Sequence, residues 1–137
     1  MLRIISFSAL ILACAAASGC ADDDTTPTTP VETPVQINES FQGSINLNGA
    51  ATHVFVSDRA GQATATLTSL SPDSAAIVSF MFGTWNGQYC QVILVKDDAT
   101  QAQNLVGNAS QGSFCVRIAD IGRLTAPTDY VISVAHF

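Results

Sequence analysis

The chain has 137 residues, and its few charged residues are mostly acidic, with 5 Lys or Arg against 11 Asp or Glu and a formal net charge of -6. This length allows one ordinary domain and little else. Binding to a nucleic acid backbone requires a patch of basic side chains, which so few scattered cations cannot form, and nucleic acid is therefore excluded as a partner.

Residues 1–19 have the layout of a secretory signal peptide, with Arg3 at the positive start and small residues at the end. The apolar stretch of about 14 residues between them is shorter than the roughly 20 that a bilayer-spanning helix needs. The sequence ASGC at 17–20 resembles the lipobox of bacterial lipoproteins. The resemblance implies cleavage before Cys20 and acylation of that residue. Ala17 departs from the Leu that is usual at the first lipobox position.

Cysteine counting also favours lipidation. Cys14 leaves with the signal peptide, so Cys20, Cys90 and Cys115 remain, an odd number in an oxidising compartment. A disulfide between Cys90 and Cys115 leaves Cys20 for an acyl anchor. The alternatives are two buried free thiols in the domain, or a secreted protein with a free or intermolecular Cys20.

The lipoprotein resemblance also predicts a location. Two or more acyl chains hold a protein firmly on a membrane, whereas a single chain binds reversibly. Lipoproteins with Asp after the lipidated cysteine tend to stay in the inner membrane, and this chain has Ala21 at that position. We therefore expect a cell-envelope protein, anchored in the outer membrane of a Gram-negative bacterium.

Residues 20–36 follow as a Thr-, Pro- and Asp-rich linker. They show no apolar periodicity and cannot bury enough surface to fold. Their prolines favour an extended conformation that reaches at most about 50 Å at ~3.1 Å per residue. We interpret the acidic run 22–24 as solvated rather than as a calcium site, because calcium needs several converging oxygen ligands. Neither a metal nor another cofactor is expected.

Residues 37–137 show the pattern of an all-β domain. Apolar and polar residues alternate, turn residues interrupt the pattern every 8 to 12 positions, and Asn-Gly pairs at 48–49 and 86–87 mark two hairpins. We expect about eight strands in an antiparallel, jelly-roll-like β-sandwich, with Thr64, Thr66 and Thr68 facing solvent. The stretches 75–82 and 89–95 are apolar at nearly every position, which predicts central strands or strands covered by a loop or partner.

Five segments carry a second resemblance. The stretches SFQGSI, HVFVSD, GQATATL, GSFCVRI and DYVISV resemble, in this order, the pre-peptidase C-terminal domains of bacteria, small jelly-roll sandwiches found beside secreted proteases. The resemblance covers most of residues 40–135 and implies a non-catalytic accessory or binding module. The segment AAIVSFMFGTW lacks the acidic residues often seen before this strand in the family, so the calcium binding of relatives does not carry over to this chain.

Candidate chemistry is sparse. No nucleophile motif accompanies His53 or His136, which predicts surface or edge histidines; a hydrolase would need one of them in a pocket with a carboxylate and a serine. Trp85 and Tyr89 flank the turn at Asn86, where both rings could form a stacking surface for a sugar or a peptide. Alternatively they cap the core, which we favour because aromatic rings dominate small cores.

The leading hypothesis is a non-catalytic envelope lipoprotein whose domain binds or adheres to a polysaccharide, a peptide or a partner protein. One alternative is a structural subunit that packs against another envelope protein through the strand at 75–82. A small hydrolase is the least favoured alternative.

Overall fold

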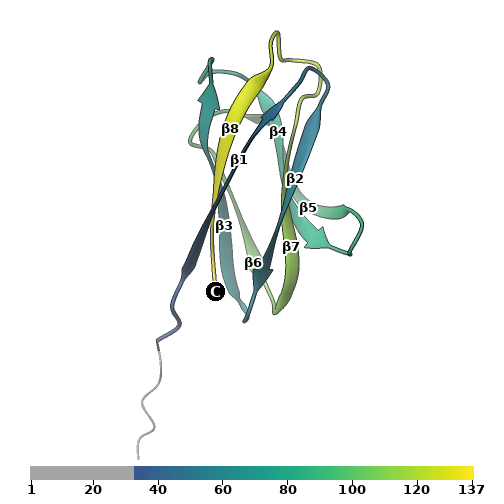
Figure 1. The fold of residues 1–137 in the computed structure, drawn as a ribbon. Coiled ribbons are helices and arrows are strands. Elements are labelled where there is room, and N and C mark those ends of the chain that lie inside the picture. The colour runs from purple at the N-terminus through teal and green to yellow at the C-terminus, as the bar shows by residue number, and fades with distance from the viewer. Residues whose placement is uncertain (1–32) are drawn as a thin grey trace, which may run out of the picture. The chain divides into compact units, whose positions relative to one another are not determined.

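The computed structural model describes residues 33–137, which form a β-sandwich of eight strands in two antiparallel sheets (Figure 1). In this part of the chain, no helix is long and apolar enough to cross a membrane. The predicted signal peptide, Cys20 and most of the predicted linker lie outside the described residues. Only residues 33–36 of the linker are described, and they precede the first strand as exposed chain without regular structure.

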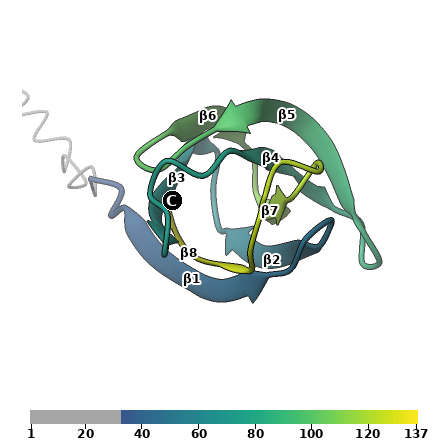
Figure 2. The ribbon, with the colours of Figure 1, turned by 90° about the horizontal axis from the view of Figure 1, so that it is seen from above.

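Apart from β4 and β5, which form a hairpin within one sheet, consecutive strands alternate between the two sheets in the order of a jelly roll, which confirms the fold predicted from the sequence pattern. The hairpin predicted at 48–49 was wrong, because the strands on either side of that turn belong to different sheets. Sheet A contains, in spatial order, β1 (Ile37–Ile45), β8 (Thr128–His136), β3 (Gly61–Ser71) and β6 (Asn104–Ala109). Sheet B contains β2 (Ala50–Ser57), β7 (Gly112–Ala119), β4 (Val78–Trp85) and β5 (Cys90–Ala99). Figure 2 shows β1 beside β2 on one side of the sandwich and β5 beside β6 on the opposite side.

The core fills the space between the sheets with the inward side chains of both. Phe55, Phe82 and Phe114 form an aromatic cluster with ring centroids 5.8 to 6.0 Å apart, and all three rings are buried. Leu67 and Ile132 of sheet A face this cluster from the other layer of the core. Since side chains alternate across a strand, every second residue of these strands is left for the outer faces.

The β4–β5 hairpin bends sharply at Gly83. A Cβ atom at this position would collide with the backbone of Gln91, so the backbone of β5 crosses β4 where a side chain is missing. The bend brings Cys90 to Cys115 of β7, with a Cα–Cα distance of 5.8 Å, although β4 lies between β5 and β7 in the sheet. The predicted disulfide is thus confirmed. Beyond this bridge the hairpin projects from the sandwich (Figures 1 and 2).

The two apolar stretches differ in their surroundings. The strand β4 is central, and its residues Val78 and Phe80 are fully buried, as predicted. The strand β5 is instead the edge of sheet B, and Val92, Ile93 and Val95 are 45% to 59% exposed, so a central position for this stretch was wrong. A continuous apolar run predicts burial, but it does not specify how many neighbours the strand has.

Candidate functional site

The outer face of sheet B carries exposed aliphatic side chains. In β7, Phe114 and Val116 point into the core, so Cys115 and Arg117 between and beside them point outward. The pairing register places the β2 and β4 neighbours of these two residues on the same outer face. We call this surface the valine face and define it by Val54, Val56, Met81, Val95 and the Cys90–Cys115 disulfide.

Exposure distinguishes the valine face from an ordinary surface. Val56 and Val95 are each 54% exposed and lie on the two opposite edge strands of sheet B, while Val54 is 38% exposed. The one cation in the middle of this face is Arg117, whose Nη1 donates a hydrogen bond of 3.0 Å to Thr52 Oγ1. The guanidinium is therefore held to one side of the aliphatic surface.

The hairpin places the predicted binding residues at the margin of this face. Trp85 is half-buried as the last residue of β4, and Tyr89 is 57% exposed; neither ring belongs to the buried core of the described chain. The Asn86 side-chain oxygen accepts hydrogen bonds from the backbone N–H groups of Gln88 (3.0 Å) and Tyr89 (2.9 Å). Asn86 therefore holds the turn in shape, and Gly87 provides its left-handed residue at φ 95°.

The outer face of sheet A has a different chemistry. The hydroxyls of Thr68 and Ser133 lie 2.9 Å apart and bond to each other across β3 and β8. Most neighbours on this face are also hydroxyl or amide side chains, and we call it the hydroxyl face. It is defined by Ser40, Gln42, Ser44, Thr64, Thr66, Thr68, Ser69, Ser71 and Ser133.

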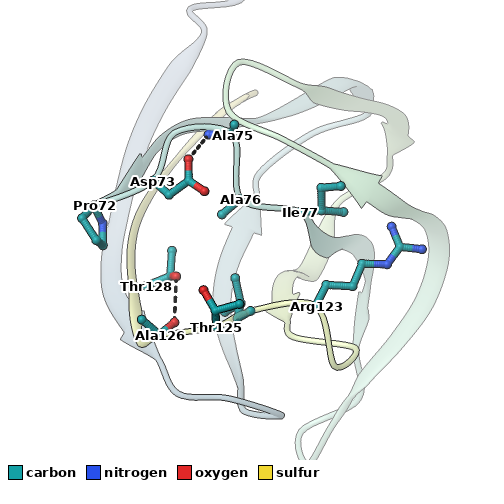
Figure 3. A pocket seen from close by; sticks show the side chains of 10 residues that line it. Pro72, Asp73, Ala75, Ala76, Ile77, Arg123, Thr125, Ala126 and Thr128 are labelled. Atoms are coloured by element: carbon teal, nitrogen blue, oxygen red, sulfur yellow. Dashed lines mark hydrogen bonds between the residues drawn. The ribbon is translucent and has the colours of Figure 1, made fainter.

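A cavity of about 300 Å³ opens between the β3–β4 and β7–β8 connections (Figure 3). Asp73 and Arg123 lie on opposite sides of it, among small side chains. One oxygen of Asp73 accepts the N–H of Ala75 at 2.8 Å, and Thr128 Oγ1 donates to the carbonyl of Ala126 at 3.2 Å. The cavity thus has room for a small polar molecule, but two of its polar groups already serve the surrounding loops.

Asp120 anchors the loop beside this cavity. Its Oδ1 accepts the backbone N–H groups of Gly122, Arg123 and Leu124 at 2.8 to 3.0 Å, and its Oδ2 accepts that of Asn48 at 2.7 Å. The bond from Asn48, followed by those from the loop, lowers the pKa of Asp120 against the opposing effect of burial. The carboxylate therefore joins the β1–β2 turn to the β7–β8 loop.

The two histidines lie in different surroundings. His53 is half-buried, stacks on Phe41 with ring centroids 5.0 Å apart and lies 2.8 Å from the Tyr130 hydroxyl through Nε2. Burial lowers the pKa of His53 and raises that of Tyr130. This group closes the side of the sandwich where β1 and β2 meet.

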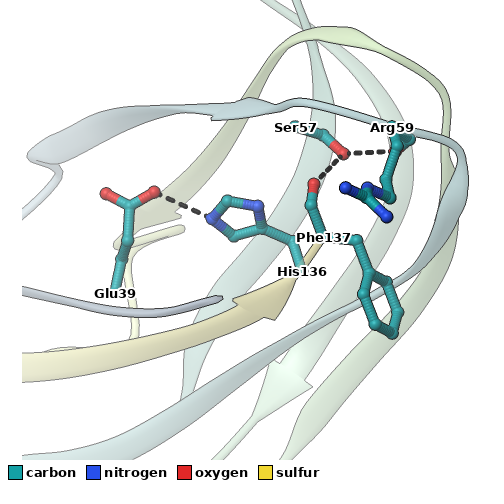
Figure 4. Close-up of polar contacts among 5 residues, drawn as sticks. All are labelled: Glu39, Ser57, Arg59, His136 and Phe137. Carbon is teal, nitrogen blue, oxygen red and sulfur yellow. Dashed lines mark hydrogen bonds and ion pairs between the residues drawn. The ribbon is translucent and has the colours of Figure 1, made fainter. Parts of the chain in front are cut away.

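His136 is buried, so its prediction as a surface or edge residue was wrong. Its ring packs against Phe55 at 4.9 Å between centroids, and its Nε2 lies 2.9 Å from Glu39 Oε1 (Figure 4). The nearby hydroxyl of Ser57 lies 2.8 Å from the carbonyl oxygens of both Arg59 and Phe137. The single Ser57 hydroxyl proton is shared between these two carbonyls, and the cluster fastens the end of β8.

Metal binding would need several converging ligands. Within residues 33–137, no group of three or more His, Cys, Asp or Glu side chains is placed to hold an ion. The acidic run at 22–24 lies outside this range.

A scan against models of known protein families finds no match to the chain, and a search of curated proteins finds none either. The jelly-roll order agrees with the fold that the resemblance to pre-peptidase C-terminal domains implies. The family assignment itself stays a prediction from the strand segments.

The valine face was missed from the sequence, although a signal was present. In the segment HVFVS, valines at 54 and 56 alternate with Phe55, so one of the two sets must point away from the core. The larger phenylalanine takes the inner position at 2% exposure, and the two valines therefore face outward.

Proposed function

We propose that this protein is a lipid-anchored, non-catalytic binding module of the cell envelope that docks a partner protein through the valine face. The observation that carries the proposal is the contrast between the two outer faces. Scattered exposed aliphatic residues are ordinary, but a contiguous apolar patch on a soluble domain marks an interaction site. Val54 and Val56 lie side by side with the disulfide between them and the hairpin.

The size of the surface supports a protein as the partner. Four strands at ~4.8 Å spacing and about eight residues at ~3.3 Å give a sheet face of roughly 500 Å². A standard interface buries about 800 Å² on each partner, so a bound protein would also contact the projecting hairpin. That hairpin supplies Trp85 and Tyr89, residue types that often dominate the binding energy of protein interfaces.

The same surface is less suited to a polysaccharide. Specific small-ligand and sugar sites combine an apolar wall with several convergent polar groups. On the valine face the polar side chains are few, and Arg117 is already bonded to Thr52. A stacked sugar on Tyr89 remains an outcome that glycan titration of tryptophan fluorescence would reveal.

The structural-subunit alternative loses the interface assigned to it. The strand at 75–82 contributes Val78, Phe80 and Phe82 to the buried core, at 0% to 1% exposure. A permanent subunit contact would have to use β5 and the valine face instead. It would then be the docking proposed above with a higher affinity.

Membrane anchoring is proposed from the sequence of residues 1–20. The test is fractionation of cells that express the Cys20→Ser variant beside a Thr25→Ser control in the linker. The anchor predicts that Cys20→Ser moves to the soluble fraction while the control stays in the membrane. Full membrane retention of Cys20→Ser would contradict it.

Docking is tested separately by chemical cross-linking in intact cells. The double variant Val56→Lys/Val95→Lys puts two charges on the valine face, and the matched double variant Ser40→Lys/Gln42→Lys puts two on the hydroxyl face at β1. We expect the cross-linked complex to disappear only with the first pair. Loss with both pairs, or with neither, would refute docking through the valine face.

A further inference from the structure

Building on the proposed docking of a protein, we infer that the partner contributes an extended segment that pairs with the free edge of β5 as a fifth strand of sheet B. The side chains of this segment enter the groove between β5 and β6. The recognition is thus β-strand addition, in which main-chain hydrogen bonds give affinity and alternate side chains give specificity.

The first observation is the state of the β5 edge. The strand β5 is the last strand of sheet B and pairs only with β4, so one row of its backbone N–H and C=O groups has no strand partner among residues 33–137. Natural proteins usually protect such edges with charges, prolines or short strands. Here Lys96, Asp97 and Asp98 protect the C-terminal end of β5, but the part before them exposes Val92, Ile93 and Val95.

The second observation is a groove of about 400 Å³ along this edge. Ile93 and Leu94 of β5 line one side, Val106 and Gly107 of β6 line the other, and Phe82 of the core is also part of the lining. Ile93 reaches this position because it is the extra residue of a bulge, between the pairs Phe82↔Leu94 and Gly83↔Val92. Gln62 and Asn108 are the polar members of the lining. An extended segment beside β5 would therefore meet both a free backbone and a groove that is mainly apolar.

The opposite side of the sandwich shows what a closed seam looks like. There β1 and β2 meet, and the stacked rings of Phe41 and His53 with the Tyr130 hydroxyl cover the junction. At the β5–β6 seam, Ile93 is 59% and Val106 45% exposed. The side chains of Leu94 and Phe82 lie against Gly107 at this seam, but Ile93 and Val106 beside them stay exposed, so it is the more exposed of the two seams.

The charges of β5 specify the chemistry of the added segment. Lys96 pairs with Asp98 at 3.4 Å, and Asp97 accepts a hydrogen bond from Ser79, which leaves this end of the strand with net negative charge. A complementary segment is basic opposite 97–98 and apolar opposite 92–95. All ladders of the described fold are antiparallel, and an antiparallel segment would carry its basic residues before its apolar ones.

A second copy of this chain fits the edge less well. In a two-fold antiparallel pair of β5 strands, the residues of one strand lie opposite those of the other about a central position. To keep the apolar residues 92–95 in the middle of the pair, this centre must be Leu94 or a residue next to it. Centring on Leu94 places Lys96 opposite Val92 and Asp98 opposite Cys90. The charged half of each strand would then meet the apolar half of the other, which disfavours self-association.

The experiment uses the full lipidated chain in detergent and two blocked peptides of eight residues. One has two lysines followed by alternating threonine and valine, and the other is its reversed sequence. Fluorescence anisotropy measures binding, and hydrogen exchange locates it. We expect the forward peptide to bind at least tenfold more tightly than the reversed one and to slow exchange of β5 amides.

Three exposed positions provide the variants. Ile93→Lys and Val106→Lys alter the groove and should weaken the forward peptide at least tenfold. Ser40→Lys, on β1 at the edge of sheet A opposite to β6, should change its affinity less than twofold. All three side chains are solvent-exposed, so unchanged urea midpoints are expected and verify folding.

Equal binding of both peptides, no binding, or insensitivity to the groove variants would overturn strand addition. A doubled mass in solution with protected β5 amides would overturn it in favour of a second copy. The two proposals fail separately: a partner cross-link that survives Ile93→Lys but not Val56→Lys/Val95→Lys keeps docking on the valine face and rejects pairing at the β5 edge.

Discussion

The two outer faces of the sandwich have the same architecture and opposite chemistry. Each belongs to a four-stranded antiparallel sheet that covers one side of a shared core. The hydroxyl face presents mainly Thr and Ser side chains, of which Thr68 and Ser133 bond to each other, whereas the valine face presents Val54, Val56 and Val95 to solvent. Packing of the core constrains only the inward side chains of each strand. The type of the outward side chains can therefore depend on what that face contacts.

The disulfide contributes to the difference between the two outer faces. Cys115 lies on the outer face of sheet B, and the bridge joins β7 to the start of β5 within the same sheet rather than joining the two sheets. It therefore fixes the projecting hairpin against the valine face. On the hydroxyl face, cross-strand contacts such as Thr68 with Ser133 are non-covalent.

The largest expected effect is removal of this bridge. Replacing Cys90 and Cys115 by serine frees a loop of 25 residues and should lower the free energy of unfolding by about 3 to 4 kcal/mol. Urea unfolding measures the loss. The matched change on the hydroxyl face, Ser133→Ala, removes one exposed hydrogen bond and should cost no more than about 0.5 kcal/mol. Equal losses in the free energy of unfolding for the two variants would contradict this difference between the faces.

The next effect concerns the bend of the hairpin. Gly83→Ala places a methyl group against the backbone of Gln91, which cannot move without shifting β5, and should destabilise the domain by about 1 to 3 kcal/mol. Gly107→Ala is the control, because its methyl group would meet a Phe82 ring carbon at 3.0 Å rather than backbone. Urea unfolding should show a smaller loss for Gly107→Ala; the reverse order would show that β5 does not depend on Gly83.

A pH effect should be common to both sheets, because Asp120 joins loops that serve both. Hydrogen bonds lower the pKa of Asp120 in the folded state, so the ionised carboxylate stabilises the fold above the unfolded value of about 3.9. This contribution is lost as pH falls through the folded pKa. The urea midpoint of the wild-type chain should fall more steeply than that of Asp120→Asn below about pH 4. Parallel curves would contradict this role.

The smallest effect on stability should come from the valine face itself. Val54→Thr with Val56→Thr changes only exposed surface and should alter the free energy of unfolding by no more than about 0.5 kcal/mol. The same pair should weaken docking of the partner, measured by cross-linking yield. A loss of stability without a loss of docking would show that these valines serve packing.

The sequence predicted local features well. Alternation located the strands, and the Asn-Gly pair at 86–87 located the β4–β5 hairpin. The pair at 48–49 lies at a turn, but the hairpin predicted there was wrong, because β1 and β2 belong to different sheets. The cysteine count left Cys90 and Cys115 to pair with each other, and the structure confirms this bridge. Each of these depends on neighbouring residues or on simple counting, because a strand repeats every two residues and a turn is set by its own sequence.

What the sequence did not reveal depends on distant residues. His136 is buried because Phe55 and Glu39, far away in the chain, pack around it. Asp120 receives a hydrogen bond from Asn48, 72 residues away. The edge position of β5 depends on the order of strands in the sheet, which an apolar run does not encode, and so the candidate site became visible only in the fold.

The most direct test of docking on the valine face is site-specific photo-cross-linking in the native envelope. A photoreactive side chain replaces Val95 in one strain and Thr66 in another, both in the full chain that carries Cys20. We predict one discrete adduct with a partner protein from position 95 and none from position 66. Adducts of equal yield from both positions, or none from position 95, would contradict the account.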